Sequence, residues 1–389
     1  MSVTFASGFV AAGIPCGIKA SGQRDLALVA TEDGAAVPVA AVFTSNKAAA
    51  APVQVSRAHL AISGGRAAAV VISSGNANAA TGERGRTDAR RMAGLVGEGL
   101  GCPAREVLVC STGLIGYYLP MDRLEAGIPE LVKARGGSDE VSMEAAHAIL
   151  TTDSRPRLAV ADGGTFRVGG MAKGAAMLAP DMATMLAVIT TDAAAEPAEL
   201  QEILRRGVER SFNSLTVDGC TSTNDTVILM ASGRAGRTDP TVLSDSVAQV
   251  CRDLAMQMAE DAEGATRTAV IRVTGSVDDA QAAAGARRVA DSQLVQCSLH
   301  GADPYWGRVV SELGSAGLEF DIDRVSIAYG GIVVCRNGVA ADHDAEALHR
   351  YMRGPRIDIQ ADLGLGPGRA AILTTDLSEE YIAENERTS

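Results

Sequence analysis

Thr184 is the residue whose setting could turn an ordinary hydroxyl group into a nucleophile. It ends the polar stretch DMAT at residues 181–184, and the apolar run at residues 185–189, typical of a buried strand, follows directly. If the bond between Ala183 and Thr184 were cut, Thr184 would carry a free α-amino group with an ordinary pKa of about 7.7–8.0. That amine could act as the base for its own hydroxyl group. The pattern allows an N-terminal nucleophile, but by itself it favours the simpler interpretation of a loop that meets a strand.

Acyl transfer by such a nucleophile also needs hydrogen-bond donors aimed at the developing oxyanion. The stretch Ser111-Thr112-Gly113 follows a short apolar run at residues 106–110. The hydroxyl group of Thr112 and the backbone N–H of Gly113 could supply these donors. In isolation, an ordinary glycine turn over residues 111–116 is the simpler interpretation.

Two further segments are open to more than one interpretation. Residues 213–226 (NSLTVDGCTSTNDT) are dense in short polar groups, which favours either a polar network near a site or a solvated loop. Residues 301–308 contain the single tryptophan and are typical of the start of a capped helix.

Composition excludes several classes of function. The 389 residues carry a formal net charge of −12, which argues against nucleic acid as a partner. No apolar run is long enough to span a membrane. The seven cysteines are scattered without a CxxC pair and the five histidines show no ligand spacing, so we expect reduced, buried thiols, a cytoplasmic location and no metal site.

Hydrophobic periodicity predicts alternating helices and strands, and hence an α/β or α+β class with layered sheets. We expect a main domain over residues 1–280 and a smaller C-terminal α/β domain over 281–389. Strands are expected at residues 25–30, 39–44, 67–72, 106–110, 226–230, 268–273, 325–328, 332–335 and 356–363, and helices at 87–96, 142–150, 198–210, 246–259, 308–313 and 345–352.

Taken together, these segments resemble the ornithine acetyltransferase family, whose members are bifunctional glutamate N-acetyltransferases. The resemblance covers nearly the whole chain. It lies in residues 8–25 (GFVAAGIPCGIKASGQRD), 73–82 (SSGNANAATG), 110–120 (CSTGLIGYYLP), 151–153, 173–192, 211–226, 263–266 (EGAT), 303–308 (DPYWGR) and 374–377.

The resemblance implies an αββα sandwich of the N-terminal-nucleophile type and a precursor that cuts itself between Ala183 and Thr184. The products would be an α chain (1–183) and a β chain (184–389), assembled as an α2β2 heterotetramer. Thr184 would be the nucleophile, with Thr112 and Gly113 as the oxyanion hole. Substrate contacts carry over to Thr152, Lys173, Thr184, Glu263, Asn385 and Ser389.

The implied reaction moves an acetyl group from N2-acetyl-L-ornithine to L-glutamate through an acetyl-Thr184 enzyme, as a step of arginine biosynthesis. No cofactor is implied, although acetyl-CoA is a possible second acetyl donor. The binding partners would be amino acids, with neither nucleic acid nor membrane.

The sequence departs from the usual family pattern at Ala176, Cys220 and Tyr305, and its tail is short. These departures leave open a paralogue in a secondary pathway with another acyl donor or acceptor. The sequence also allows an N-terminal-nucleophile amidohydrolase or aminopeptidase, in which water takes the acyl group, or a non-catalytic relative.

Overall fold

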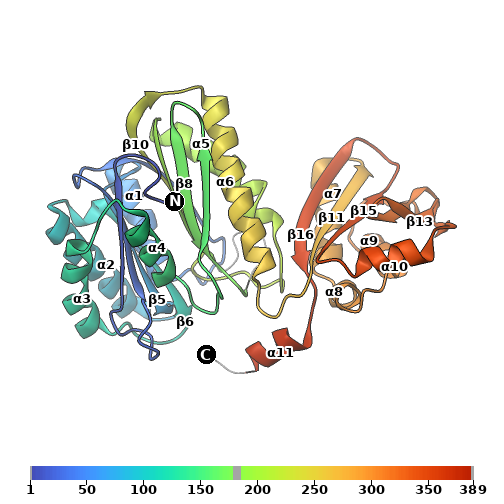
Figure 1. The fold of residues 1–389 in the computed structure, drawn as a ribbon, viewed down its shortest axis with the longest axis horizontal. Coiled ribbons are helices and arrows are strands. Elements are labelled where there is room, and N and C mark those ends of the chain that lie inside the picture. Colours follow the sequence, from blue (N-terminus) through green and yellow to red (C-terminus); the bar gives the residue numbers. More distant parts are fainter. Residues whose placement is uncertain (1, 178–184, 387–389) are drawn as a thin grey trace. The chain divides into compact units, whose positions relative to one another are not determined.

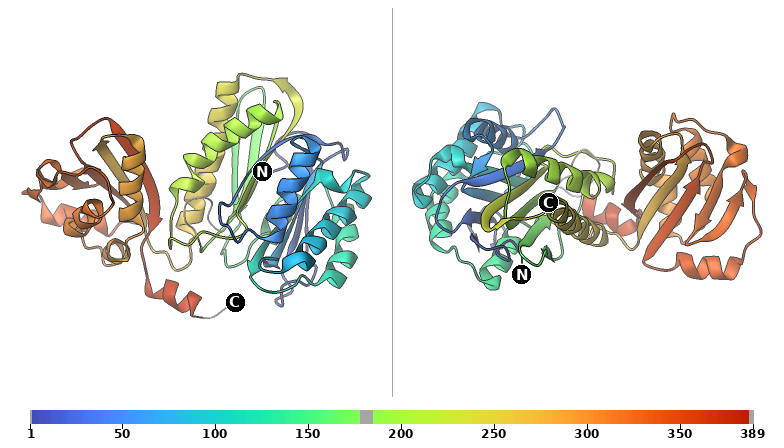
Figure 2. Two further views of the ribbon diagram at one scale, coloured as in Figure 1. Left: turned by 180° about the vertical axis from the view of Figure 1, so that it is seen from behind. Right: turned by 90° about the horizontal axis from the view of Figure 1, so that it is seen from above.

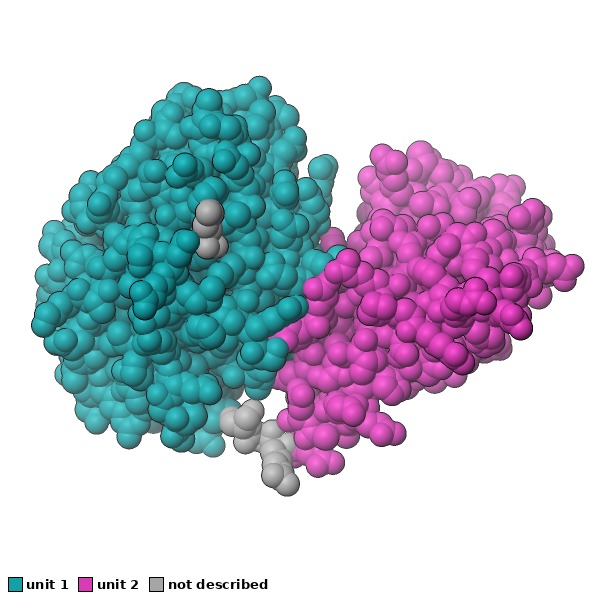
Figure 3. Space-filling model, in the orientation of Figure 1, with its two compact units in different colours: residues 1–213, 221–258, 389 teal, residues 214–220, 259–388 magenta. Residues whose placement is uncertain are grey.

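The computed structural model describes residues 2–177 and 185–386, and the chain divides into two compact units. The first unit comprises Met1–Asn213 and Thr221–Met258, and the second comprises Ser214–Cys220 and Ala259–Thr388 (Figure 3). The boundary expected between residues 280 and 281 falls inside helix α7 (Asp279–Ala290). The division comes earlier because strand β11 (Thr268–Ser276) pairs within the sheet of the second unit.

The first sheet of the first unit has the strand order β1-β2-β5-β6. Its strands are β1 (Phe9–Ile14), β2 (Leu26–Thr31), β5 (Ala69–Asn76) and β6 (Val107–Leu114). Strands β5 and β6 run parallel, and such a pair needs a long crossover connection, which here contains helix α2 (Gly82–Leu100). The turn expected over residues 111–116 is in part strand, because β6 continues to Leu114 by pairing with β5.

The second sheet of the first unit has the order β4-β3-β10-β9-β8-β7. Its strands are β3 (Val37–Phe43), β4 (Arg66–Ala67), β7 (Arg157–Asp162), β8 (Arg167–Lys173), β9 (Leu186–Ala194) and β10 (Thr226–Arg237). Strand β9 is buried almost throughout, as the apolar run after residue 184 predicts. It pairs parallel with β10 and antiparallel with β8. One apolar core, which includes Val29 and Ile72 of the first sheet and Val188 and Ile228 of the second, joins the two sheets.

Helices cover the outer faces of both sheets (Figures 1 and 2). Helices α1 (Ala51–Ser63), α2 and α3 (Met121–Lys133) pack against the outer face of the first sheet. Helix α4 (Asp139–Ala148) instead contacts β1 and β2 and adds Ala145, Ala146 and Ala148 to the core between the two sheets. Helices α5 (Pro197–Glu209) and α6 (Pro240–Glu260) cover the second sheet. The four layers confirm the predicted αββα sandwich.

The second unit holds one sheet, in the order β14-β13-β12-β15-β11-β16, and helices α7 to α11. The expected pair of short strands is confirmed, because β12 (Ser326–Tyr329) and β13 (Ile332–Arg336) pair antiparallel around Gly330 and Gly331, both with positive φ. The remaining strands are β14 (Val339–Ala340), β15 (Arg356–Asp362) and β16 (Gly368–Thr375), and the remaining helices are α8 (Gln293–His300), α9 (Trp306–Gly314), α10 (Ala345–Met352) and α11 (Glu379–Asn385).

Three short 3-10 turns complete the described chain, at Ala104–Glu106, Phe212–Ser214 and Ile322–Arg324. Among the helices of residues 2–177 and 185–386, none is long and apolar enough to cross a membrane. The seven cysteines are free, but Cys220 and Cys297 are exposed and only Cys110, Cys251 and Cys335 are buried.

Candidate active site

Thr112 and Gly113 lie together at the end of β6, where it runs beside β5. The register places Ser74 opposite Thr112 and Gly75 opposite Gly113. Gly113 has a φ of 129°, and a Cβ atom there would lie 2.5 Å from the backbone nitrogen of Asn76. Glycine is therefore required at this position, both by its backbone angle and by the close approach of the neighbouring strand.

Gly113→Ala tests this requirement. We expect it to lower the free energy of unfolding by more than the roughly 1–3 kcal/mol of a strained backbone alone, because the strand must also move away. Gly116→Ala is the matched control, since Gly116 also has a positive φ of 91° but nothing lies within 4 Å of the added Cβ. Urea unfolding followed by far-ultraviolet circular dichroism measures both, and equal losses would show that the strand contact costs nothing.

Lys173 ends strand β8 and joins the two sheets through its ammonium group. The residue is buried, with 2% of its surface exposed. Its Nζ donates to Thr151 Oγ1 at 2.6 Å and lies 3.4 Å from Thr112 Oγ1. Two predicted site residues, Lys173 and Thr112, are thus brought together from different sheets.

Asp153 balances the charge of this lysine. Its Oδ2 lies 3.6 Å from Lys173 Nζ, and its Oδ1 pairs with the buried guanidinium group of Arg157 and accepts the backbone N–H of Gly174 at 2.7 Å. Burial alone would raise the pKa of Asp153, but Lys173, Arg157 and the backbone N–H groups of Thr151 and Gly174 together lower it well below its usual range. The result is a buried carboxylate between two buried cations.

Thr151 and Thr152 differ in their environment. Thr151 contacts Lys173 and donates its backbone N–H to Asp153 Oδ2 at 2.9 Å, whereas the Thr152 residue is exposed. Of the two, Thr151 is therefore the one that belongs to the lysine cluster of the described structure.

The predicted nucleophile Thr184 and its neighbour Ala183 lie outside the described residues, and Met185 is the first described residue after them. The backbone of Met185 is held on both sides: its N–H donates to Asp225 Oδ1 at 2.8 Å, and its carbonyl accepts the N–H of Thr226 at 3.1 Å. These contacts continue the pairing of β9 with β10 by one residue.

Asn224 and Asp225 are side chains whose roles could not be assigned from the sequence. The Asn224 amide donates to the backbone oxygen of Ser111 at 2.8 Å and to that of Ala77 at 2.6 Å. Of the two interpretations of residues 213–226, the buried polar network holds for residues 222 and 224–226. The signal in the sequence was the run of short polar side chains directly before an apolar strand.

Asp225 is fully buried, and burial raises its pKa well above its usual range. The Met185 N–H, Ser222 and the charge of Lys173 oppose this shift without cancelling it. Its second oxygen, Oδ2, has no hydrogen-bond partner within the described residues. Burial therefore favours the neutral form of this carboxyl group more than solvent would.

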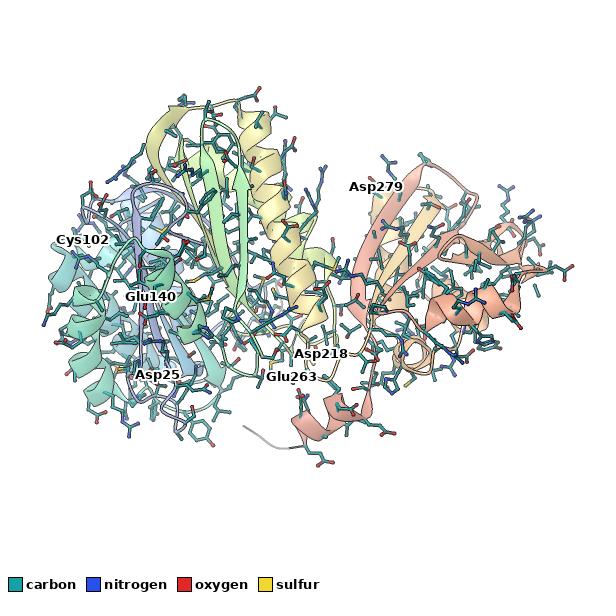
Figure 4. All side chains as sticks on the ribbon, viewed as in Figure 1. Asp25, Cys102, Glu140, Asp218, Glu263 and Asp279 are labelled. Atoms are coloured by element: carbon teal, nitrogen blue, oxygen red, sulfur yellow. The ribbon has the colours of Figure 1, made fainter. Side chains whose placement is uncertain are left out.

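Glu263 and Asn385 lie in the second unit and contact each other. Asn385 Nδ2 donates to Glu263 Oε2 at 2.8 Å and to the carbonyl oxygen of Tyr381. Glu263 and Asp218 are labelled in Figure 4, and Asp218 accepts from the Tyr381 hydroxyl at 3.4 Å. Ser389 lies outside the described residues.

Asp376 fixes the backbone that follows Glu263. It accepts the N–H groups of Thr266 and Arg267, each at 2.8 Å, and it contacts Nδ1 of His300 at 2.9 Å. Within the described residues, no group of three or more His, Cys, Asp and Glu side chains could hold a metal ion.

Comparison with known proteins gives full-length matches. A sequence profile of the ArgJ family matches residues 10–388. The arginine biosynthesis bifunctional protein ArgJ of Mycolicibacterium paratuberculosis is 47% identical over 394 residues, which cover 100% of this chain and 96% of that protein. The protein of the same name from Thermobifida fusca is 44% identical over 392 residues, which cover 100% of both chains.

Two solved structures are similar to parts of the chain. The crystal structure of ArgJ from Bacillus halodurans matches with a TM-score of 0.49 and 33% identity, and the match covers 50% of this chain and 95% of that chain. Ornithine acetyltransferase from Mycobacterium tuberculosis, solved in complex with ornithine, matches with a TM-score of 0.44 and 46% identity, covering 46% of this chain and 94% of that chain.

Proposed function

Because this chain belongs to the ArgJ family, we propose that it moves the acetyl group of N2-acetyl-L-ornithine to L-glutamate through an acetyl-enzyme at Thr184. The protein is an acetyltransferase of arginine biosynthesis. The proposal concerns the residues that perform the transfer, the substrates that they bind, and the cleavage that prepares them.

The observation that carries the proposal concerns two successive side chains directly before β10, those of Asn224 and Asp225. Asn224 holds the backbone oxygen of Ser111, which precedes Thr112, and Asp225 holds the backbone N–H of Met185, which follows Thr184. One short segment thereby contacts the residue before the predicted oxyanion donors and the residue after the predicted nucleophile. This is the kind of rigid positioning on which acyl transfer depends.

Self-cleavage begins when Thr184 Oγ attacks the carbonyl carbon of Ala183 and forms an ester as the C–N bond breaks. The proton lost by the hydroxyl group is balanced by the proton gained by the departing nitrogen. This step already frees the α-amino group of Thr184. One water molecule then hydrolyses the ester, which restores the Thr184 hydroxyl group, leaves a carboxylate on Ala183 and separates chains 1–183 and 184–389.

Acetyl transfer then proceeds in two half-reactions. The free amine takes the proton of Thr184 Oγ as the oxygen attacks the acetyl carbonyl of acetyl-ornithine. Thr112 Oγ1–H and the Gly113 N–H stabilise the oxyanion, and ornithine leaves with the proton. The amine of glutamate next attacks the acetyl ester, which restores the Thr184 hydroxyl group and releases N-acetyl-L-glutamate.

Charged side chains supply the substrate contacts in this proposal. Lys173 would pair with a substrate carboxylate, and Glu263, with Asn385 beside it, would meet an ammonium group. Thr152 and Ser389 remain proposed contacts, with Thr151 the better-supported member of the threonine pair because it already contacts Lys173.

The assembly and the second donor are further proposals. We expect the two chains to form an α2β2 heterotetramer in the cytoplasm. No cofactor is required by the ping-pong reaction, and acetyl-CoA would enter only as an alternative acetyl donor to the same Thr184.

Mass spectrometry of the denatured wild-type protein tests the cleavage step. We expect two fragments, divided between residues 183 and 184, with the second chain starting TMLAV. A single intact mass after long incubation of a protein that still turns over would contradict the proposed nucleophile.

Product analysis tests the transfer step. With acetyl-ornithine and glutamate together, we expect N-acetyl-glutamate and ornithine in equal amounts. Acetate and ornithine, formed at a rate that does not depend on glutamate, would instead identify an amidohydrolase.

A further inference from the structure

Asp225 differs from Asp25 and Asp192, two other buried carboxyl groups of the first unit, in the hydrogen bonds that it makes to the described residues. Asp25 accepts three backbone N–H groups, from Cys16, Ile18 and Lys19. Asp192 accepts one N–H on each oxygen, from Arg167 and Ser7. Asp225 accepts the Met185 N–H on Oδ1, while its buried Oδ2 lacks a partner within the described residues.

An unpartnered buried oxygen lowers stability, typically by the desolvation of one polar group, so a carboxyl group here needs a reason other than stability. The position of Asp225 in the sheet supplies such a reason. Asp225 is the last residue before β10, and β10 runs parallel to β9, the strand that begins one residue after Met185.

We infer that Asp225 is a positioning residue for Thr184, which acts by holding the backbone N–H of Met185. The inference rests on the proposed function. The Met185 N–H belongs to the peptide group that joins residues 184 and 185, and a peptide group is planar. A hydrogen bond to this N–H therefore orients the plane that also contains the Cα and carbonyl atoms of residue 184.

Hydrogen bonds from Thr44 hold the backbone around Asp225 in place. The carbonyl oxygen of Asp225 accepts the N–H of Thr44 at 3.0 Å, and the Thr44 hydroxyl group donates to the backbone oxygen of Ser222 at 2.7 Å. The backbone at residues 222 and 225 is thus fixed by the residue that directly follows β3. A group held in this way can orient its neighbour without ordering cost at the moment of reaction.

Two substitutions test whether Asp225 acts by positioning Thr184 or in some other way. Asp225→Asn keeps a carbonyl oxygen that can accept the Met185 N–H, and we expect cleavage and turnover close to wild type. Asp225→Ala removes the acceptor, and we expect cleavage to slow by about 100-fold, the size of effect that a misplacement of about 1 Å can have. In the cleaved fraction of this variant we expect kcat to fall while KM stays near the wild-type value.

Asp192→Ala is the matched control, because it removes another buried carboxyl group near the opposite end of strand β9. It should lower the melting temperature but leave the cleavage rate unchanged. Cleavage is followed by mass spectrometry, and circular dichroism confirms the fold of each variant. If Asp225→Ala does not fold, Asp225→Val, which also lacks the acceptor but fills more of the space, takes its place.

Two outcomes would overturn the inference. One is an Asp225→Ala protein that cleaves and turns over like wild type. The other is an Asp225→Asn protein that folds but cleaves as slowly as a variant without the acceptor. In that case the proton of the carboxyl group, and not the position of its oxygen atom, would be what matters. Continued turnover by Thr184→Ala would instead overturn the proposed function, so the two failures are distinguishable.

Discussion

Thr184→Ala is expected to yield one uncut chain of 389 residues with no measurable acetyl transfer. The substitution removes the oxygen that attacks in both reactions, and without cleavage no free α-amino group is formed. Loss of a catalytic nucleophile typically lowers kcat on the order of 10⁶-fold. Mass spectrometry of the denatured protein and the rate of N-acetyl-glutamate formation measure the two effects.

Thr190→Ala is the matched control for this substitution. Thr190 lies on β9 in the strand that follows Thr184, and its buried hydroxyl group donates to the carbonyl oxygen of Val3 at 2.7 Å. We expect Thr190→Ala to lower the free energy of unfolding by about 1 kcal/mol, the contribution of one hydrogen bond, and to leave cleavage unchanged. Thr184→Ser should retain both activities in part. Acetyl transfer by an uncut Thr184→Ala protein would remove the basis of the mechanism.

The periodicity of the sequence predicted those elements that depend on local signals. Helix α10 was predicted with the same bounds that it has in the structure, and β12 and β13 were predicted as a pair because two glycines mark the turn between them. Strand β15 alternates buried and exposed residues as expected. Helix α3 was not predicted, since it contains Gly127 and Pro129, and tertiary packing on β1 and β2 outweighs their low helix propensity.

Only those site residues that belong to a family motif could be predicted from the sequence. Thr112, Gly113 and Lys173 come from the resemblance, and the structure brings Thr112 and Lys173 together. No local pattern shows that Asp225 will lie against Met185, 40 positions before it in the chain, or that Asn224 will hold Ser111. These contacts arise from the pairing of β10 with β9 and from the packing of two sheets, which one-dimensional spacing does not encode.

Asp153→Asn is expected to destabilise the first unit by about 3–5 kcal/mol, the usual cost of breaking a buried ion pair on one side. Asp153 and Arg157 are both inaccessible to solvent, and Lys173 is nearly so. Asparagine keeps the shape but leaves two buried cations without a counter-charge. Urea unfolding in the Thr184→Ala background, followed by far-ultraviolet circular dichroism, measures the loss on a single uncut chain.

The expected pH dependence follows from the depressed pKa of Asp153. A carboxyl group with a lowered folded-state pKa stabilises the fold above its unfolded value of 3.8, and this contribution is lost as the pH falls below that value. The difference between wild type and Asp153→Asn should therefore be full at pH 7 and smaller at pH 3.

Two internal references make the Asp153 experiment decisive. Trp306 lies in the second unit, so its fluorescence should report an unfolding midpoint that the substitution does not move. Glu202→Gln removes a carboxylate from the exposed ion pairs with Arg205 and Arg206, where solvent screens the charges, and little change is expected. If Asp153→Asn were as mild as Glu202→Gln, the buried carboxylate would not be what holds Lys173 in place beside Thr112.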